Sequence, residues 1–129
     1  MREKRDLPKP TEAELELLRA LWDMGSASVR ELHEVVSSQR PLGYTSVLKT
    51  LQIMTEKGLV ERTEAGKAHI YRAAATQEET QNQLLRDLSE RLFSGSAAQL
   101  AMHALAMQPA SEEELEEIRR IIRQKREKQ

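Results

Sequence analysis

Cysteine is absent from this sequence, and aromatic residues make up only 3% of it. Without cysteine the chain can form neither a disulfide framework nor a thiolate metal site, and it has no cysteine nucleophile. With so few aromatic side chains, the core must consist mainly of Leu, Ile, Val, Met and Ala. In a chain of 129 residues of which 32% are charged, little apolar surface is left for a core, so burial between two subunits is a natural source of stability.

Long hydrophobic runs are also missing. The apolar runs are only a few residues long, whereas a membrane-spanning helix needs about 20. The first residues, MREKRDLPKPT, contain no apolar segment of a secretory signal. We therefore expect a cytoplasmic protein that does not insert into a membrane.

The chain has no excess of one charge, because its formal net charge is −1. The distribution is less even: residues 40–72 contain six basic and three acidic side chains, whereas residues 76–129 contain eight basic and ten acidic ones. Positive charge therefore gathers in the middle of the chain. Such a basic segment indicates contact with nucleic acid, although this bias is modest.

A repeated capping motif marks where helices begin. In Ser/Thr-x-x-Glu/Gln, the hydroxyl and the acidic or amide side chain satisfy each other's backbone N–H groups at a helix start. The motif begins at Thr11, Ser28, Thr76, Ser96 and Ser111, each time before an apolar pattern of helical period. Together with a turn at Arg40–Gly43, these patterns predict helices over residues 12–24, 29–38, 45–57, 76–93, 96–107 and 111–126, with a frayed tail after the last.

The periodicity changes after the third helix. Residues 59–62 and 68–72 are typical of short strands, and the turn over residues 63–67 contains Gly66. Three short helices followed by a hairpin are the element order of a winged helix. The predicted fold is therefore mainly α with a small β-hairpin: a winged helix-turn-helix domain over residues 1–75, followed by a three-helix dimerisation domain over residues 76–129.

Apolar periodicity identifies the expected core and the expected subunit contact. In the N-terminal domain we expect burial of Leu15, Leu18, Leu21, Trp22, Val29, Leu32, Val35, Val36, Val47, Leu51 and Met54. The apolar stripes of the last three helices have little to pack against within one chain. The residues expected to form a homodimer contact there are Leu84, Leu88, Leu92, Leu100, Leu105, Leu115, Ile118 and Ile122.

The helix over residues 45–57 has two unlike faces. At 100° per residue, Val47, Leu51 and Met54 share one side, and the opposite side is short and polar. Ser, Thr, Gln and Lys side chains reach phosphates and base edges, and N-terminal amides of a helix bind phosphate. The candidate DNA-binding residues, with two from the wing, are Tyr44, Thr45, Ser46, Lys49, Thr50, Gln52, Ile53, Lys57, Lys67 and His69.

Two other interpretations of this helix stay open. The residue pattern of this helix is also that of an ordinary amphipathic helix with a solvated face. Ile53 is either a contact to a thymine methyl group or a tolerated exposed residue. A winged helix can also serve as a protein–protein interaction module without sequence-specific DNA binding. DNA affinity that falls steeply with rising salt distinguishes a repressor from such a module.

Nothing in the sequence indicates an enzyme, a cofactor or a metal site. His33, His69 and His103 are widely separated and have no Ser or Asp partners in a catalytic pattern. No HxxxH or CxxC spacing is present. Acidic residues such as Glu12, Glu14 and Glu16 lie in first helical turns, where they offset the helix dipole, so we interpret them as helix-stabilising.

Two long segments, LPKPTEAELELLRALWDMGSASVRELHEVV and GYTSVLKTLQIMTEKGLVERTEAGKAHIYR, resemble the penicillinase-repressor family of the BlaI/MecI/CopY type. LFSGSAAQLAMHAL and SEEELEEIRRII are similar to its dimerisation helices, so the resemblance runs from Leu7 to Ile122. It implies a bacterial repressor that binds a palindromic operator as a homodimer. The matching recognition-helix positions are Thr45, Ser46, Lys49, Thr50 and Gln52.

The resemblance also implies target genes and a mode of release. Members repress β-lactamase, penicillin-binding or copper-handling genes, so we expect control of the protein's own operon or of β-lactam, cell-wall or stress-response genes. Release by a membrane sensor protease is implied for the β-lactam branch, whose Asn-Phe cleavage pair aligns with His103-Ala104. Many members have Arg where this chain has Ile53, and the C-terminal cysteines of the copper-responsive branch are missing.

Overall fold

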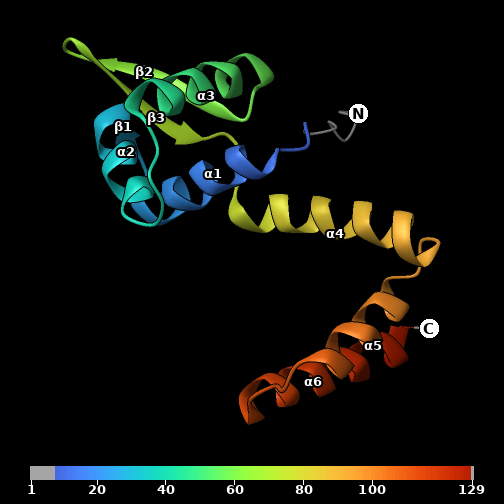
Figure 1. The fold of residues 1–129 in the computed structure, drawn as a ribbon. Coiled ribbons are helices and arrows are strands. Elements are labelled where there is room, and N and C mark those ends of the chain that lie inside the picture. Colours follow the sequence, from blue (N-terminus) through green and yellow to red (C-terminus); the bar gives the residue numbers. More distant parts are fainter. Residues whose placement is uncertain (1–7, 129) are drawn as a thin grey trace. The chain divides into compact units, whose positions relative to one another are not determined.

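The computed structural model describes residues 8–128, so Leu7 and the basic segment before it lie outside the described residues. Residues 8–128 form six helices and a three-stranded sheet (Figure 1). The elements are α1 (Glu12–Met24), β1 (Ala27–Ser28), α2 (Val29–Ser37), α3 (Tyr44–Lys57), β2 (Val60–Ala65), β3 (Ala68–Ala73), α4 (Gln77–Phe93), α5 (Ala97–Met107) and α6 (Glu112–Lys128). The mainly helical class with a small hairpin is confirmed.

The chain divides into two compact units between Leu84 and Leu85, within α4. The first unit contains α1, α2, α3 and the sheet, together with the beginning of α4. Thr80, about one helical turn beyond the predicted boundary at residues 75 and 76, is only 5% exposed. The indole nitrogen of Trp22 also donates a 3.0 Å hydrogen bond to the carbonyl oxygen of Ala75, just before α4.

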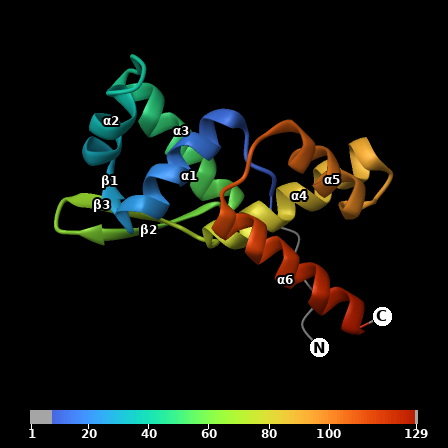
Figure 2. The ribbon, with the colours of Figure 1, turned by 90° about the horizontal axis from the view of Figure 1, so that it is seen from below.

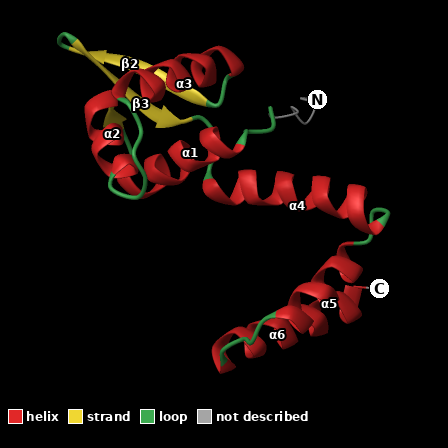
Figure 3. Ribbon diagram, in the orientation of Figure 1, coloured by secondary structure: helices red, strands yellow, loops and turns green. Residues whose placement is uncertain are grey.

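The sheet has the strand order β1-β3-β2, and both pairings are antiparallel (Figure 3). The β2–β3 hairpin pairs from Val60 with Ala73 to Ala65 with Ala68, and its tip extends beyond α1, α2 and α3 in both views (Figures 1 and 2). The predicted turn over residues 63–67 was too long, because residues 63–65 pair within the hairpin and only Gly66 and Lys67 connect the strands. Strand β1 was not predicted, since two residues contain no periodic pattern.

The core of the first unit lies between the three helices and the sheet. Leu21, Leu32, Leu51, Met54 and Tyr71 are at most 1% exposed. The predicted burial of Val35 was wrong: it is 39% exposed, because the buried face of α2 is centred on Val29, Leu32 and Val36. In α1, Leu15 and Trp22 are only half-buried and Leu17 is buried instead, since the inward face runs through Leu17, Leu18 and Leu21.

The capping motifs determine where helices start. Both reciprocal hydrogen bonds of the capping box form at Thr11, Ser28, Thr76 and Ser111. Ser96 accepts a 3.1 Å hydrogen bond from the amide of Gln99. The expected frayed tail after residue 126 was wrong, because α6 continues as a helix to Lys128.

The second unit contains the rest of α4 with α5 and α6, and it has almost no core of its own. No residue of α5 or α6 is buried. Leu92 is 66% exposed, Met102 55% and Met107 76%. Among residues 8–128, no helix is both long and apolar enough to cross a membrane.

Candidate nucleic-acid interface

The turn between α2 and α3 is held by contacts from the neighbouring helices. Nε2 of His33 lies 2.7 Å from the carbonyl oxygen of Leu42, and its ring meets Tyr44 edge-on with 5.8 Å between centroids. Nη2 of Arg40 donates a 2.8 Å hydrogen bond to Glu16 in α1. These contacts determine where the chain enters α3, so α3 begins at Tyr44, one residue earlier than predicted.

The N-terminus of α3 is open. Gly43 is its N-cap and supplies no side chain, so no side-chain hydrogen bond satisfies the first amides of α3. Tyr44 beside it is 47% exposed. Free N–H groups at a helix start, together with the positive end of the helix dipole, favour an anionic group such as a phosphate.

One face of α3 is buried and the other is exposed, as predicted. Val47, Leu51 and Met54 are at most 2% exposed. The opposite face presents hydroxyl, amide and ammonium groups together with one large apolar side chain, Ile53, which is 42% exposed. The exposed residues of this face, named the α3 outer face below, are Thr45, Ser46, Lys49, Gln52, Ile53 and Glu56.

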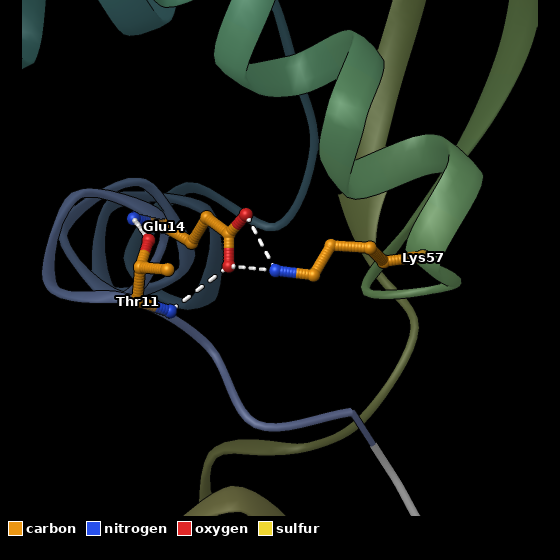
Figure 4. Close-up of polar contacts among 3 residues, drawn as sticks. All are labelled: Thr11, Glu14 and Lys57. Atoms are coloured by element: carbon orange, nitrogen blue, oxygen red, sulfur yellow. Dashed lines mark hydrogen bonds and ion pairs between the residues drawn. The ribbon is translucent and has the colours of Figure 1, made fainter.

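Two of the predicted contact residues in α3 have partners within the chain. The hydroxyl of Thr50, which is half-buried, donates a 2.9 Å hydrogen bond to the carbonyl oxygen of Ser46. Nζ of Lys57 lies 2.8 Å from Oε1 and 2.9 Å from Oε2 of Glu14 (Figure 4). Both side chains therefore differ from Lys49, which is exposed and forms no ion pair with any described residue.

Glu14 is the one buried carboxylate in the described part of the chain, at 4% exposed. Burial alone would raise its pKa. The hydrogen bonds from Lys57 and from the backbone N–H of Thr11, with the charge of Lys57, outweigh burial and lower the pKa below its usual range. Glu14 is therefore ionised at neutral pH, and it has a counter-charge.

The β2–β3 hairpin forms the wing. Lys67 is exposed at its tip, next to Gly66, whose φ of 65° permits the tight turn. Nε2 of His69 lies 3.6 Å from Oε2 of Glu64 on the facing strand. Arg62 is a further exposed cation of the wing, and it was not predicted as a DNA contact. Its signal was a basic residue within a predicted wing strand, which is weak without knowledge of its neighbours.

The structure brings the predicted α3 residues together on one helix and the predicted wing residues together on one hairpin. No group of three or more His, Asp or Glu side chains that could hold a metal ion exists within residues 8–128. His33 and His69 belong to the turn and the wing, and His103 lies in α5 beside Phe93, with 5.0 Å between the ring centroids. What the site offers is a polar surface with few charges rather than a catalytic pocket.

Comparison with known proteins gives the family. The model of the penicillinase repressor family matches residues 10–124. The chain belongs to the penicillinase repressor family. The methicillin resistance regulatory protein MecI of Mammaliicoccus sciuri is 20% identical over 113 residues, which are 88% of this chain and 92% of that protein. The transcriptional regulator BlaI of Mycobacterium tuberculosis is 34% identical over 77 residues, which are 59% of this chain and 56% of that protein.

Solved structures show the same fold for the first unit. The DNA-binding domain of the repressor BlaI has a TM-score of 0.52 at 18% identity, with 59% of this chain and 93% of that one covered. The monomeric form of Bacillus licheniformis BlaI, solved in complex with the blaP half-operator, has a TM-score of 0.51 at 19% identity, with 57% and 90% covered. The winged helix-turn-helix is thereby confirmed. Family and fold are those of transcriptional repressors rather than of enzymes.

Proposed function

We propose that this chain is a bacterial transcriptional repressor that binds a palindromic DNA operator as a homodimer. The observation that supports this best is the α3 outer face, which presents hydroxyl, amide and ammonium groups beside an uncapped helix N-terminus. These are the groups that bind base edges and phosphates in a major groove. Membership of the penicillinase repressor family points to the same function.

Within this proposal, α3 enters the major groove and the wing lies along the adjacent backbone. Gln52 is placed to bind a base edge and Lys49 to bind a guanine or a phosphate, and Tyr44 lies where the open helix N-terminus would meet a phosphate. The residues assigned to the interface are Tyr44, Thr45, Ser46, Lys49, Thr50, Gln52 and Ile53 of α3, with Lys67 and His69 of the wing. Lys57 is not among them, because its ammonium group is bound to Glu14.

The homodimer is supported by the exposed apolar side chains of the second unit. Leu92, Leu105 and Ile122 are all exposed. Half-buried within one chain are Leu88, Leu100, Leu115 and Ile118, together with Leu84, the last residue of the first unit. A single winged helix reads only a few base pairs, so a specific site needs two half-sites at helical spacing. The B. licheniformis relative was solved as a monomer on a half-operator, and the same division, one protomer to each half-site, is proposed here.

The proposal places the protein in the bacterial cytoplasm, at its own operon or at β-lactam, cell-wall or stress-response genes. The position that aligns with the Asn-Phe cleavage pair of the β-lactam branch is His103-Ala104, so that pair itself is not carried over, and His103-Ala104 lies inside α5. Nδ1 of His103 is 2.9 Å from the carbonyl oxygen of Gln99, so that turn of α5 would have to open before cleavage.

Footprinting on the region upstream of the protein's own gene tests the proposal. A protected palindrome is expected on this fragment and no protection on a scrambled duplex of the same composition. Affinity should fall steeply as salt is raised from about 50 to 200 mM, because several phosphates are neutralised. Absence of any salt-dependent binding to the upstream fragment would contradict the proposal and favour a protein-interaction module.

A further inference from the structure

An ion pair joins the start of α1 to the end of α3, between residues far apart in the sequence. Glu14 lies in the first turn of α1 and Lys57 is the last residue of α3. Nζ of Lys57 lies 2.8 and 2.9 Å from the two carboxylate oxygens of Glu14 (Figure 4). Because an ammonium group is a compact charge with three rotatable donors, these two short contacts fix the distance between the two side chains.

The carboxylate of Glu14 is also fixed to its own helix. Its Oε1 accepts a 2.9 Å hydrogen bond from the backbone N–H of Thr11, and its own amide donates a 3.2 Å hydrogen bond to Oγ1 of Thr11. These bonds form the capping box of α1 and hold the carboxylate relative to the helix start. The carboxylate to which Lys57 binds is therefore held by α1.

Lys57 is fixed on its other side by the end of α3. The next residue, Gly58, has a φ of 84° and its amide bonds the carbonyl oxygens of Met54 and Thr55. The amide of Leu59 then donates to Met54 at 2.9 Å. The chain can therefore not move freely at this end of α3, and the ion pair connects an ordered helix end to an ordered helix start.

A small change in the tilt of α3 at Lys57 produces a large displacement of the N-terminal turn of α3. A helix of 14 residues is roughly 20 Å long, so a tilt of about 10° at Lys57 moves the N-terminal turn by about 3 Å. That displacement equals the length of a hydrogen bond, so it would separate Tyr44 from a DNA group bound there. Lys49, about 12 Å from Lys57 along the helix, would move by about 2 Å.

We propose that Glu14 and Lys57 are positioning residues of the DNA-binding surface: their ion pair sets the orientation of α3 on α1, and Lys57 contacts no phosphate. The proposal rests on the DNA-binding function proposed above. Lys57 has a side chain only 33% exposed, and moving its ammonium group to DNA would leave Glu14 buried without a counter-charge. Lys49 on the α3 outer face has no such constraint.

The test compares operator affinity over a salt series for the full chain and its variants. Glu14→Gln removes the charge but keeps the capping box, which accepts Gln as well as Glu at this position. Lys57→Met removes the ammonium group and keeps an unbranched side chain. Lys49→Met is the matched control for a direct DNA contact. The probe is a fluorescent duplex from the region upstream of the protein's own gene, used at a temperature where circular dichroism shows each variant folded.

Glu14→Gln and Lys57→Met are each expected to weaken binding by about tenfold, with the slope of log affinity against log salt unchanged. The double variant is expected to bind no more weakly than either single one, because both remove the same interaction. Lys49→Met is expected to reduce the slope by about one. If Lys57→Met does not fold, Lys57→Gln replaces it, since its amide can still donate to Glu14; the same unchanged slope is expected.

Two results overturn the inference. One is a slope reduced by about one in Lys57→Met while Glu14→Gln binds normally, which would make Lys57 a phosphate contact. The other is an unchanged affinity for the duplex in both Glu14→Gln and Lys57→Met, which would show that the ion pair does not set the orientation of α3. Failure of the unsubstituted protein to bind the duplex would instead contradict the proposed function itself, so the two failures are distinguishable.

Discussion

At the scale of single residues, Glu14 shows how local and distant partners act on one carboxylate. Burial disfavours its charged form, whereas Thr11 of the same helix turn and Lys57 of another helix favour it. Burial is the largest single effect, but the hydrogen bonds and the charge of these two residues together outweigh it, so the pKa of Glu14 is lowered in the folded chain. Because the unfolded chain has the ordinary value of about 4.3, Glu14 links folding stability to pH.

The sign of this linkage leads to a prediction for acid solution. A lowered folded pKa contributes stability that is present above the unfolded value and is lost as the pH falls through the folded value. The difference in free energy of unfolding between the wild type and Glu14→Gln should therefore be constant from about pH 5 to 7 and shrink below about pH 4.3. Urea unfolding at fixed protein concentration, followed by the fluorescence of the single tryptophan, Trp22, measures this difference.

Subtraction of the Glu14→Gln series removes the contribution of the other carboxylates, which titrate in both proteins. A difference that stays constant down to strongly acidic solution would show that Glu14 is not stabilised in its ionised form.

Lys49 is the residue whose substitution tests the DNA-binding surface directly. It is exposed on the α3 outer face and has no ion-pair partner among the described residues. Lys49→Ala should weaken operator binding by about 1–3 kcal/mol without changing the dimer, because Lys49 is exposed on the α3 outer face. Titration of the duplex and sedimentation equilibrium measure the two effects separately. Unchanged binding would mean that another element meets the DNA.

At the scale of elements, α3 combines completely buried side chains with the proposed DNA-binding surface. Leu51 is completely buried, whereas Ile53, two residues later, is 42% exposed. Since α3 is both part of the core and the proposed reading helix, its stability and its contacts can be separated by substitutions on opposite faces.

Leu51→Ala is expected to lower the free energy of unfolding by about 2–5 kcal/mol, because it leaves a cavity among α1, α2 and α3. Ile53→Ala is the matched control and should change it by less than about 0.5 kcal/mol, as is usual for exposed positions. Thermal and urea unfolding of both variants give the comparison. Equal effects of the two would mean that α3 is rotated from the orientation described here.

The elements also show what periodicity can predict. Thr11, Ser28, Thr76 and Ser111 identify helix starts because the capping bonds join residues only three positions apart. The two-residue strand β1 was missed because its pairing partners, Tyr71 and Ile70, lie more than forty positions away. Val35 was wrongly placed in the core because the phase of α2 depends on what its neighbours cover.

At the scale of the whole molecule, the exposed apolar side chains of the second unit need a partner surface that buries them. Helix α6 has Leu115, Ile118 and Ile122 on one stripe, yet no residue of α6 is buried. A second copy of the chain is the partner that the proposed dimer supplies, and each protomer would then deliver one α3 to the operator.

Leu100→Asp and Ile118→Asp should each dissociate the dimer and abolish operator binding, because they place a charge in the proposed contact. Gln99→Asp is the control, since it adds the same charge one residue away at an exposed position. Sedimentation equilibrium and operator titration are the measurements. A fully dimeric Leu100→Asp or Ile118→Asp variant would contradict the proposed subunit contact.

The sequence by itself determined where the helices start, which face of α3 is buried and which residues form the α3 outer face. These features depend on residues three to seven positions apart, whose spacing can be read along the chain. Only the tertiary structure decided that Lys57 contacts Glu14, which lies 43 positions away in the sequence. In the sequence Glu14 is a capping residue and Lys57 a candidate DNA contact. Folding brings both to one place, because long-range contacts depend on how whole helices pack.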